Sequence, residues 1–335
     1  MISIDGSYQE GGGQILRTSL ALSTILNKEV EIFNIRKKRK RPGLAEQHLR
    51  VIEVYKKIFG ARCEGDCLGS QKIRFFPFQK VKSPYIKIIP QTSSSIGLIL
   101  QAILPPLYFL DKKITLEIGG GSAGKWAPPF EFYPYVVFPL LNIEAEVKIK
   151  KMGYYPQGGG LVWINFKNFS HKRIELAERK DLEKITIMSF SSSSLKERRV
   201  AERQLESALR ILKKQSKKEI ETKIEYVDTV SSGCHLIIYA KFCKGIILWT
   251  DALGERGKTA ESVGREAAEK FLKEIDSGSC CDFHLADNLI PYLAFLGGKI
   301  KTSEVSQHTF TNIWVCEKFL EKIFKVEENN IEAKI

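Results

Sequence analysis

Five histidines are present, and His308 has the setting that best fits chemistry on an anion. It stands in the polar stretch 306–312, which we expect to form a loop just before a helix. Loops of this kind often carry functional residues. A neutral imidazole, with an unperturbed pKa of about 6.5, is nucleophilic near pH 7. A surface or core role is the alternative interpretation, because most isolated histidines have no chemical task.

A carboxylate and three glycines form a second candidate. Glu10 directly precedes Gly11, Gly12 and Gly13, and we expect a helix to begin just beyond them. Glycines let the backbone approach a ligand closely, so a metal ligand or a phosphate-adjacent carboxylate fits this position. A partner for the helix dipole is the alternative, and composition alone does not decide between them.

Six consecutive basic residues, 36–41, form a third candidate. They are closed by Pro42 and Gly43 and come before a predicted helix. Arginine forks and a helix N-terminus together bind phosphate well. A solvated charge run or a localisation signal is the alternative. The chain carries 52 Lys+Arg against 39 Asp+Glu, a net charge of +13, so we favour nucleic-acid phosphate as the partner.

Other familiar motifs are excluded. The segment 252–259 resembles a phosphate-binding loop, but Ala252 replaces the required glycine, so we predict a strand-to-helix turn with Thr259 as the helix cap. The seven cysteines show no paired zinc spacing or secreted framework, which favours a reducing cytosol. The N-terminus does not resemble a signal peptide, and the most apolar window, 95–110, falls short of a membrane span. We therefore expect a cytoplasmic protein with no membrane partner.

The elements that must position these residues repeat along the chain. Three segments, starting near Gln14, Ser95 and Asp287, each run from an apolar helix into a β-rich stretch, followed by a second helix. The second helices are expected near Gly43, Phe130 and Thr311. Residues 184–275 have a different pattern, which indicates an inserted domain. We predict an α+β fold whose repeated αβ core spans 1–183 and 276–335, with a smaller inserted α+β domain at 184–275.

At these residues the sequence resembles the RNA 3′-terminal phosphate cyclase family. The matching motifs cover essentially the whole chain and keep their order: DGSYQEGGGQILR (5–17), RKKRKRPGLAEQHL (36–49), SSSIGLILQAILPP (93–106), APPFEF (127–132), GYYPQGGG (153–160), LGERGKTAESVG (253–264), HLADNLIPYLA (284–294) and SQHTFTNIWV (306–315). The Pro-x-Gly-Gly-Gly signature at 156–160 is particularly specific.

The resemblance implies a fold and an activity. The fold is a core of three repeated αβ units, related in architecture to enolpyruvyl transferases, with a smaller inserted domain. The activity is ATP-dependent conversion of an RNA 3′-phosphate end to a 2′,3′-cyclic phosphate. A histidine takes AMP from ATP, AMP passes to the RNA 3′-phosphate, and the neighbouring 2′-hydroxyl displaces AMP as the ring closes.

The resemblance also implies a role for each matching residue. His308 matches the adenylated histidine, and Glu10 matches the carboxylate that binds Mg²⁺ or Mn²⁺. ATP binding falls on Gln101, Pro128, Pro129, His284, Leu285, Ala286, Asp287 and Asn288. Phosphate and RNA binding falls on Arg17, Arg36, Arg39, Gln47 and His48. Two departures are present: many members have Tyr at the position of His284, and the usual acidic turn is Gly120-Gly121-Ser122-Ala123.

Two rival functions come from the same architecture. One is a catalytically silent, cyclase-like RNA-binding factor in ribosome biogenesis; such proteins lack the nucleophilic histidine, so His308 argues against it. The other is an enolpyruvyl-transferase-like enzyme, which the signature at 156–160 and the motif at 284–288 disfavour.

Overall fold

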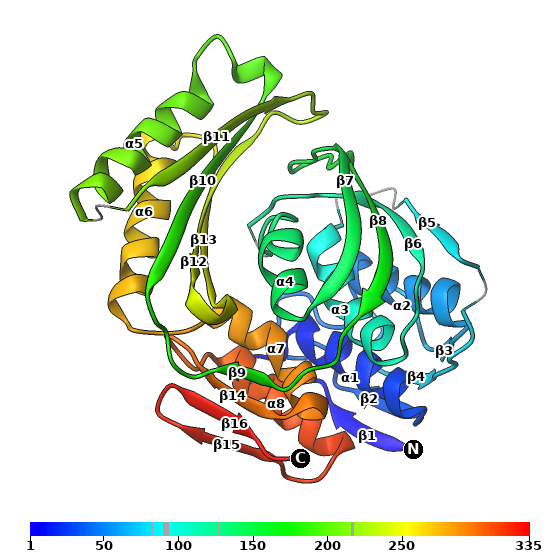
Figure 1. Cartoon of the computed structure of the whole chain (residues 1–335). Helices are drawn as coiled ribbons and strands as arrows, with labels where there is room; N and C mark the ends of the chain where they lie inside the picture. Colours follow the sequence, from blue (N-terminus) through cyan, green and yellow to red (C-terminus); the bar gives the residue numbers. More distant parts are fainter. Residues whose placement is uncertain (82, 90–93, 126, 216–217) are drawn as a thin grey trace.

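The computed structural model describes residues 1–81, 83–89, 94–125, 127–215 and 218–335. Ser93, the first residue of the motif at 93–106, lies outside these ranges. Within them, the strands form four four-stranded sheets (Figure 1). The sheets contain β1 (Ile2–Asp5), β2 (Val30–Phe33), β3 (Arg62–Glu64) and β4 (Ile73–Phe76); β5 (Tyr85–Ile88), β6 (Thr115–Gly120), β7 (Ile143–Lys151) and β8 (Gly160–Phe169); β9 (Ile174–Leu176), β14 (Gly298–Lys301), β15 (Phe324–Glu327) and β16 (Asn330–Ala333); and β10 (Leu182–Ser192), β11 (Ile220–Val227), β12 (Cys234–Phe242) and β13 (Ile247–Leu253).

Three of these sheets in the described part of the chain repeat one topology. In each, the first strand is parallel to the second, the second is antiparallel to the fourth, and the fourth is antiparallel to the third. The sheet of β10 to β13 differs, because its first strand pairs with both the second and the third. The chain leaves the third repeating sheet after β9 and returns to it at β14, with the fourth sheet in between.

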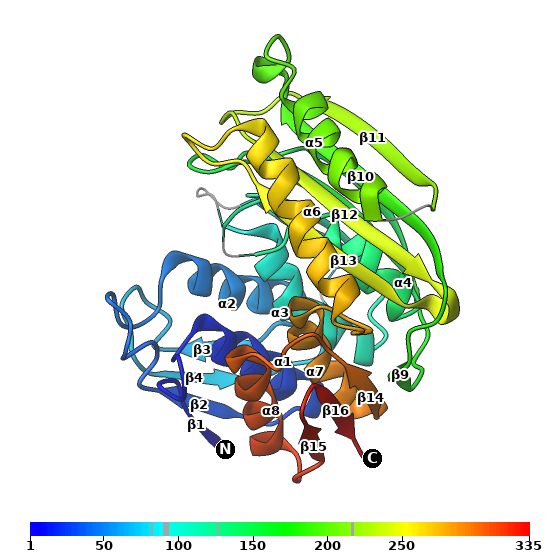
Figure 2. The same ribbon diagram turned by 90° about the vertical axis from the view of Figure 1, so that its left-hand side faces the viewer.

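The helices lie against these sheets in pairs. Their bounds are α1 (Gly13–Leu26), α2 (Glu46–Phe59), α3 (Ile96–Phe109), α4 (Phe138–Leu140) with the preceding π-helical turn η1 (Tyr133–Val137), α5 (Val200–Gln215), α6 (Ala260–Asp276), α7 (Phe283–Leu296) and α8 (Gln307–Phe319). α3 is apolar on all sides and accordingly buried, as its neighbours α1, α2 and α7 surround it. α1 packs on both α3 and α8, and α8 packs on α7 (Figure 2).

The sheet of β10 to β13 stands apart from the rest, with α5 and α6 on its outer face (Figure 1). Its other face meets η1 through aromatic rings: Tyr239 stacks on Tyr135 with centroids 5.3 Å apart, and Trp249 meets Phe132 at 5.8 Å. These contacts hold β13 and α6 over the start of α7, where a pocket opens.

Most of the predicted elements are present, but several helices begin three or four residues from the expected position. The α+β class is confirmed, and Thr259 caps α6 through a hydrogen bond from the Ser262 backbone. The helix expected near Thr311 begins earlier, at Gln307, so His308 lies in its first turn and not in a preceding loop. The reason is Ser306, whose hydroxyl accepts a hydrogen bond from the Thr309 backbone and starts the helix there. No helix in the described residues is long and apolar enough to cross a membrane.

Candidate active site

The candidate nucleophile lies where the first turns of three helices meet. A β-carbon built on Gly12, just before α1, would lie 4.0 Å from Cε1 of His308 in the first turn of α8. One built on Gly13 would lie 2.2 Å from Nε2 of His48 in the first turn of α2. Helix N-termini present free backbone N–H groups and a partial positive charge. Their convergence therefore favours a bound phosphate chain.

His308 is open to solvent and faces a carboxylate. Its side chain is 45% exposed, and its Nε2 lies 3.7 Å from Oε2 of Glu10. The same carboxylate oxygen accepts a hydrogen bond from Arg39 at 3.1 Å. The structure thus brings together the predicted nucleophile, the predicted metal carboxylate and one predicted phosphate ligand, although they lie far apart in the sequence.

The start of α8 is fixed by Asp287 of α7. Oδ1 of Asp287 accepts a 2.7 Å hydrogen bond from the Ser306 hydroxyl and a short one from the Thr309 hydroxyl. Gln14 of α1 donates to the His308 carbonyl at 3.1 Å. Burial raises the pKa of Asp287 to about 6, although these hydroxyl bonds favour the carboxylate. The carboxyl group of Asp287 therefore holds the first turn of α8 in place around His308. Its Oδ1 is already hydrogen-bonded to two hydroxyl groups of that turn.

Two basic side chains lie beside Gly13: Arg17, which is partly buried, and His48, which is buried. Arg17 donates from Nε to the side-chain oxygen of Gln101 at 2.8 Å, and desolvation lowers the pKa of Arg17 to about 10, so it stays charged at pH 7. Nδ1 of His48 accepts a hydrogen bond from the Ala45 backbone N–H at 3.0 Å. Burial, together with Arg17 and Arg36, lowers the pKa of His48 to about 3. His48 is thus a neutral imidazole whose proton is on Nε2, the atom nearest Gly13.

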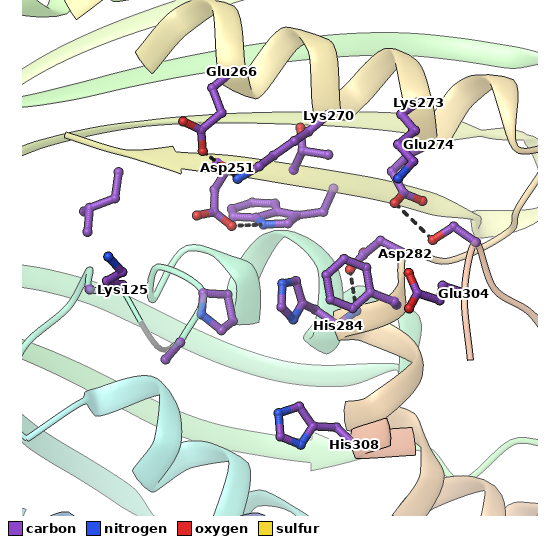
Figure 3. A pocket seen from close by; sticks show the side chains of 18 of the residues that line it. Lys125, Asp251, Glu266, Lys270, Lys273, Glu274, Asp282, His284, Glu304 and His308 are labelled. Atoms are coloured by element: carbon purple, nitrogen blue, oxygen red, sulfur yellow. Dashed lines mark hydrogen bonds and ion pairs between the residues drawn. The ribbon is translucent and has the colours of Figure 1, made fainter. Parts of the chain in front are cut away.

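A pocket of about 660 Å³ opens on one side of His308 (Figure 3). His284, at the start of α7, projects into it, and Pro128 is another of its lining residues. Desolvation lowers the pKa of His284 to about 4, so its ring is neutral at pH 7. A flat ring and a proline are suitable surfaces for an adenine base, and the volume is that of a small-molecule site.

The remaining predicted residues have varied positions. Leu285 and Ala286 are fully buried, so their side chains support α7 and face no pocket. The side-chain amide of Gln47 makes two hydrogen bonds to the backbone of Ser95, the N-cap of α3. Its Nε2 donates to the Ser95 carbonyl, and its Oε1 accepts from the Ser95 N–H. The other predicted residues are placed as follows: Asn288 donates to the His284 carbonyl, Arg36 donates to the Gly43 carbonyl, and Pro129 is buried beside Pro128.

The sequence analysis missed the far wall of the pocket, which comes from β13 and α6. This wall carries Trp249, Asp251, Lys270, Lys273 and Glu274 (Figure 3). Lys270 pairs with Glu266 at 2.8 Å. No local motif marks these residues, because α6 has the charge pattern of an ordinary solvated helix. Only the tertiary packing of the fourth sheet on η1 brings them to the pocket.

One pocket residue gives a stability prediction. Asp282, the N-cap of α7, accepts two backbone N–H bonds through Oδ1, while its buried Oδ2 has no hydrogen-bond partner. Burial, with Glu274 nearby, raises its pKa to about 8. The unfolded chain releases this proton near pH 4, whereas the folded chain keeps it to about pH 8. Asp282 thus lowers stability progressively as the pH rises across that window.

Asp282→Asn keeps the cap acceptor but has no proton to release. We expect its melting temperature to exceed that of the wild type by several degrees at pH 8, and the difference to shrink toward pH 5. Thermal unfolding followed by circular dichroism from pH 5 to 8 measures this difference. The exposed Asp276→Asn is the control and should follow the wild-type curve. Parallel curves for the wild type and Asp282→Asn contradict the prediction.

The surroundings of Glu10 decide whether this carboxylate could hold a metal ion. In the described part of the chain, no group of three or more His, Cys, Asp or Glu could hold a metal ion alone. Mg²⁺ is usually held by one or two carboxylates together with substrate phosphates and water. Glu10 is 36% exposed and lies beside an arginine and the start of α1. It fits a cation that arrives with a triphosphate better than a resident ion.

These parts define an α+β protein of the kind that handles phosphate esters, with an accessible histidine, a carboxylate and arginines beside a nucleotide-sized pocket. The chain belongs to the RNA 3′-terminal phosphate cyclase family, whose model matches residues 8–326. It is 40% identical to the RNA 3′-terminal phosphate cyclase of Pyrococcus furiosus over 331 residues, covering 98% of this chain and 95% of that protein. It is also 40% identical to the cyclase of Archaeoglobus fulgidus over 339 residues, covering all of both chains. The family predicted from the motifs is therefore confirmed.

Proposed function

We propose that this protein converts RNA 3′-terminal phosphates to 2′,3′-cyclic phosphates, using ATP and a covalent histidine–AMP intermediate. The observation that carries the proposal is the place of His308. Its side chain is 45% exposed and lines a nucleotide-sized pocket, and its Nε2 lies 3.7 Å from Glu10, which also pairs with Arg39. Membership of the cyclase family supports the same reaction.

In the first step, Nε2 of His308 attacks the α-phosphorus of ATP. A nitrogen–phosphorus bond forms, and the bond to the bridging oxygen breaks to release pyrophosphate. Adenine lies between His284 and Pro128 in the pocket. The α1 N-terminus, Arg17 and Arg39 stabilise the charge on the departing phosphates. When bound at Glu10, Mg²⁺ or Mn²⁺ supplies further neutralisation of that charge.

In the second and third steps, AMP moves to the RNA and then leaves it. An oxygen of the RNA 3′-phosphate attacks the histidine-bound phosphorus, and the imidazole departs as its nitrogen–phosphorus bond breaks. The neighbouring 2′-hydroxyl then attacks the RNA phosphorus, loses its proton, and AMP leaves. Arg36, Arg39 and the neutral Nε2–H of His48 donate hydrogen bonds to the RNA phosphate, since such donors match its charge.

The proposed function includes a division of the chain into a catalytic core and an inserted domain. Residues 1–183 and 276–335 form a catalytic core of three αβ units related to enolpyruvyl transferases, and 184–275 form an inserted domain that closes the pocket. The shared strand order of three sheets supports the division. The protein acts in the cytoplasm, and its partners are ATP and RNA.

The rival function, a non-catalytic RNA-binding factor in ribosome biogenesis, predicts a site without a nucleophilic histidine. The exposed imidazole, its carboxylate partner and the adjoining pocket disfavour that rival. No contact in the described residues favours phosphoenolpyruvate chemistry over ATP chemistry.

The test is an end-group assay. Purified protein is incubated with an oligoribonucleotide whose terminal 3′-phosphate carries the label, with Mg²⁺ or Mn²⁺, and with or without ATP. We expect the label to become resistant to phosphatase only when ATP is present, and an oligonucleotide ending in a 3′-hydroxyl to be unchanged. Full phosphatase sensitivity after incubation with both metals contradicts the proposed function.

A further inference from the structure

Two aromatic side chains and a lysine follow one another along α8 beyond His308: Phe310 and Lys318 are exposed, and Trp314 is partly buried against the core. Phe310, Trp314 and Lys318 are spaced four residues apart, so they lie on one face of the helix. Phe310 is 43% exposed, which is unusual for a phenylalanine two residues from a candidate nucleophile. The pocket beside His308 does not include any of these three residues.

This row of side chains continues onto the loop that carries Glu10. The Tyr8 ring stacks on the Trp314 ring with centroids 4.1 Å apart and planes 6° apart. Lys318 places its Nζ 5.4 Å from the centroid of the same ring. Among the described residues no aromatic ring pairs with Phe310, and 43% of this residue is exposed. We call Tyr8, Phe310, Trp314 and Lys318 the α8 platform.

The α8 platform adjoins the site where the RNA phosphate is proposed to bind. Tyr8 is two residues from Glu10, whose carboxylate contacts both His308 and Arg39. Lys38, from the basic run, donates to the Gln9 carbonyl at 3.2 Å. The platform therefore adjoins both the candidate nucleophile and a strongly positive loop, and α8 lies beside β1 in Figure 2.

The chemistry of this surface matches single-stranded RNA. Unpaired bases stack on aromatic side chains whatever their identity, while lysine and arginine contact the phosphates between them. A chain with a net charge of +13 adds long-range attraction for such a polyanion. A nonpolar protein partner would leave the adjoining cations without a counterpart.

We propose that the α8 platform binds the 3′-terminal bases of the RNA substrate, with a base stacked on Phe310 and phosphates near Lys38 and Lys318. This inference rests on the proposed function. It assigns a task to residues of α8 and of the loop before Glu10 that do not line the nucleotide pocket. The 3′-phosphate end then enters along α8 and reaches the nucleophile from the basic loop.

The test separates RNA binding from ATP chemistry. Phe310→Ala removes the stacking ring, and we expect the KM for a 3′-phosphorylated oligoribonucleotide to rise about 10-fold. Phe310→Tyr should restore a near wild-type KM. Labelling of the protein by ATP alone should be unchanged, because that step uses no RNA. Phe78→Ala is the matched control: it is 51% exposed, and the adjacent Gln79 contacts the far end of α1.

A modified substrate provides a second measurement. An oligonucleotide with an abasic 3′-terminal nucleoside should raise the KM of the wild type but cause little further rise in Phe310→Ala. An unchanged KM in Phe310→Ala, or an equal abasic effect in both proteins, overturns the platform and leaves this surface to a protein partner. A wild type that is labelled and cyclises RNA while Phe310→Ala behaves normally refutes only the platform. A wild type that does neither refutes the proposed function.

Discussion

His308→Ala is expected to lose covalent labelling by α-labelled ATP and to lower RNA cyclisation by a factor on the order of 10³ or more. The other two imidazoles of the site cannot replace it: His48 is buried with its Nδ1 hydrogen-bonded to the Ala45 N–H, and His284 lies where adenine is proposed to bind. The fold should be preserved, because the His308 side chain is half exposed and meets only Glu10 at ion-pair distance among the described residues. Labelling followed by gel electrophoresis measures the first effect, and the end-group assay measures the second.

The three-step mechanism gives this variant a sharper test. Ring closure does not use the histidine, so RNA supplied already joined to AMP at its 3′-phosphate should still cyclise with His308→Ala. His171→Ala is the matched control, because His171 is an exposed histidine whose ring contacts the Tyr108 carbonyl in a different part of the core. A label that persists in His308→Ala means that another residue is the nucleophile.

The sequence predicted the elements better than it predicted their ends. Apolar periodicity located the helices of each repeat, because hydrophobic faces are a local property. The start of α8 was placed too late because Gln307, His308 and Thr309 are polar and look like a loop. The structure shows that Ser306 caps the helix there, supported by Asp287. That support comes from another helix, so no local pattern could reveal it.

The residues of the candidate site could be named from the sequence, but the geometry that brings them together could not. Glu10, His308 and Arg39 were named from motifs, whereas their contact depends on pairings such as that of Gln14 with the His308 carbonyl, 294 residues apart. The wall formed by β13 and α6 was missed for the same reason. Its lysines and acids have ordinary helix spacing, and only the packing of the fourth sheet on η1 gives them a site.

Gly13→Ala is expected to lower kcat/KM for cyclisation about 100-fold, the effect of moving a catalytic group by about 1 Å. Gly13 is the first residue of α1, so alanine is compatible with its backbone. The new methyl group would lie 2.2 Å from Nε2 of His48 and 3.2 Å from Nη1 of Arg17. This clash forces the imidazole to move, although it is buried and held by the Ala45 N–H. The moved ring then no longer aims Nε2–H at the phosphate site.

Two comparisons distinguish loss of the site from loss of the fold. The clash in Gly13→Ala should lower the melting temperature. Gly264→Ala places a methyl group 2.0 Å from the Gln204 carbonyl between α5 and α6, so it should lower the melting temperature too. Its kcat/KM per folded molecule should nevertheless stay within a few-fold of the wild type. Adding His48→Ala to Gly13→Ala removes the atoms that the methyl group meets, so stability should recover while cyclisation stays slow. Wild-type kcat/KM in Gly13→Ala would show that the reaction does not require His48 at this position, and the donor role assigned to its Nε2–H would fail.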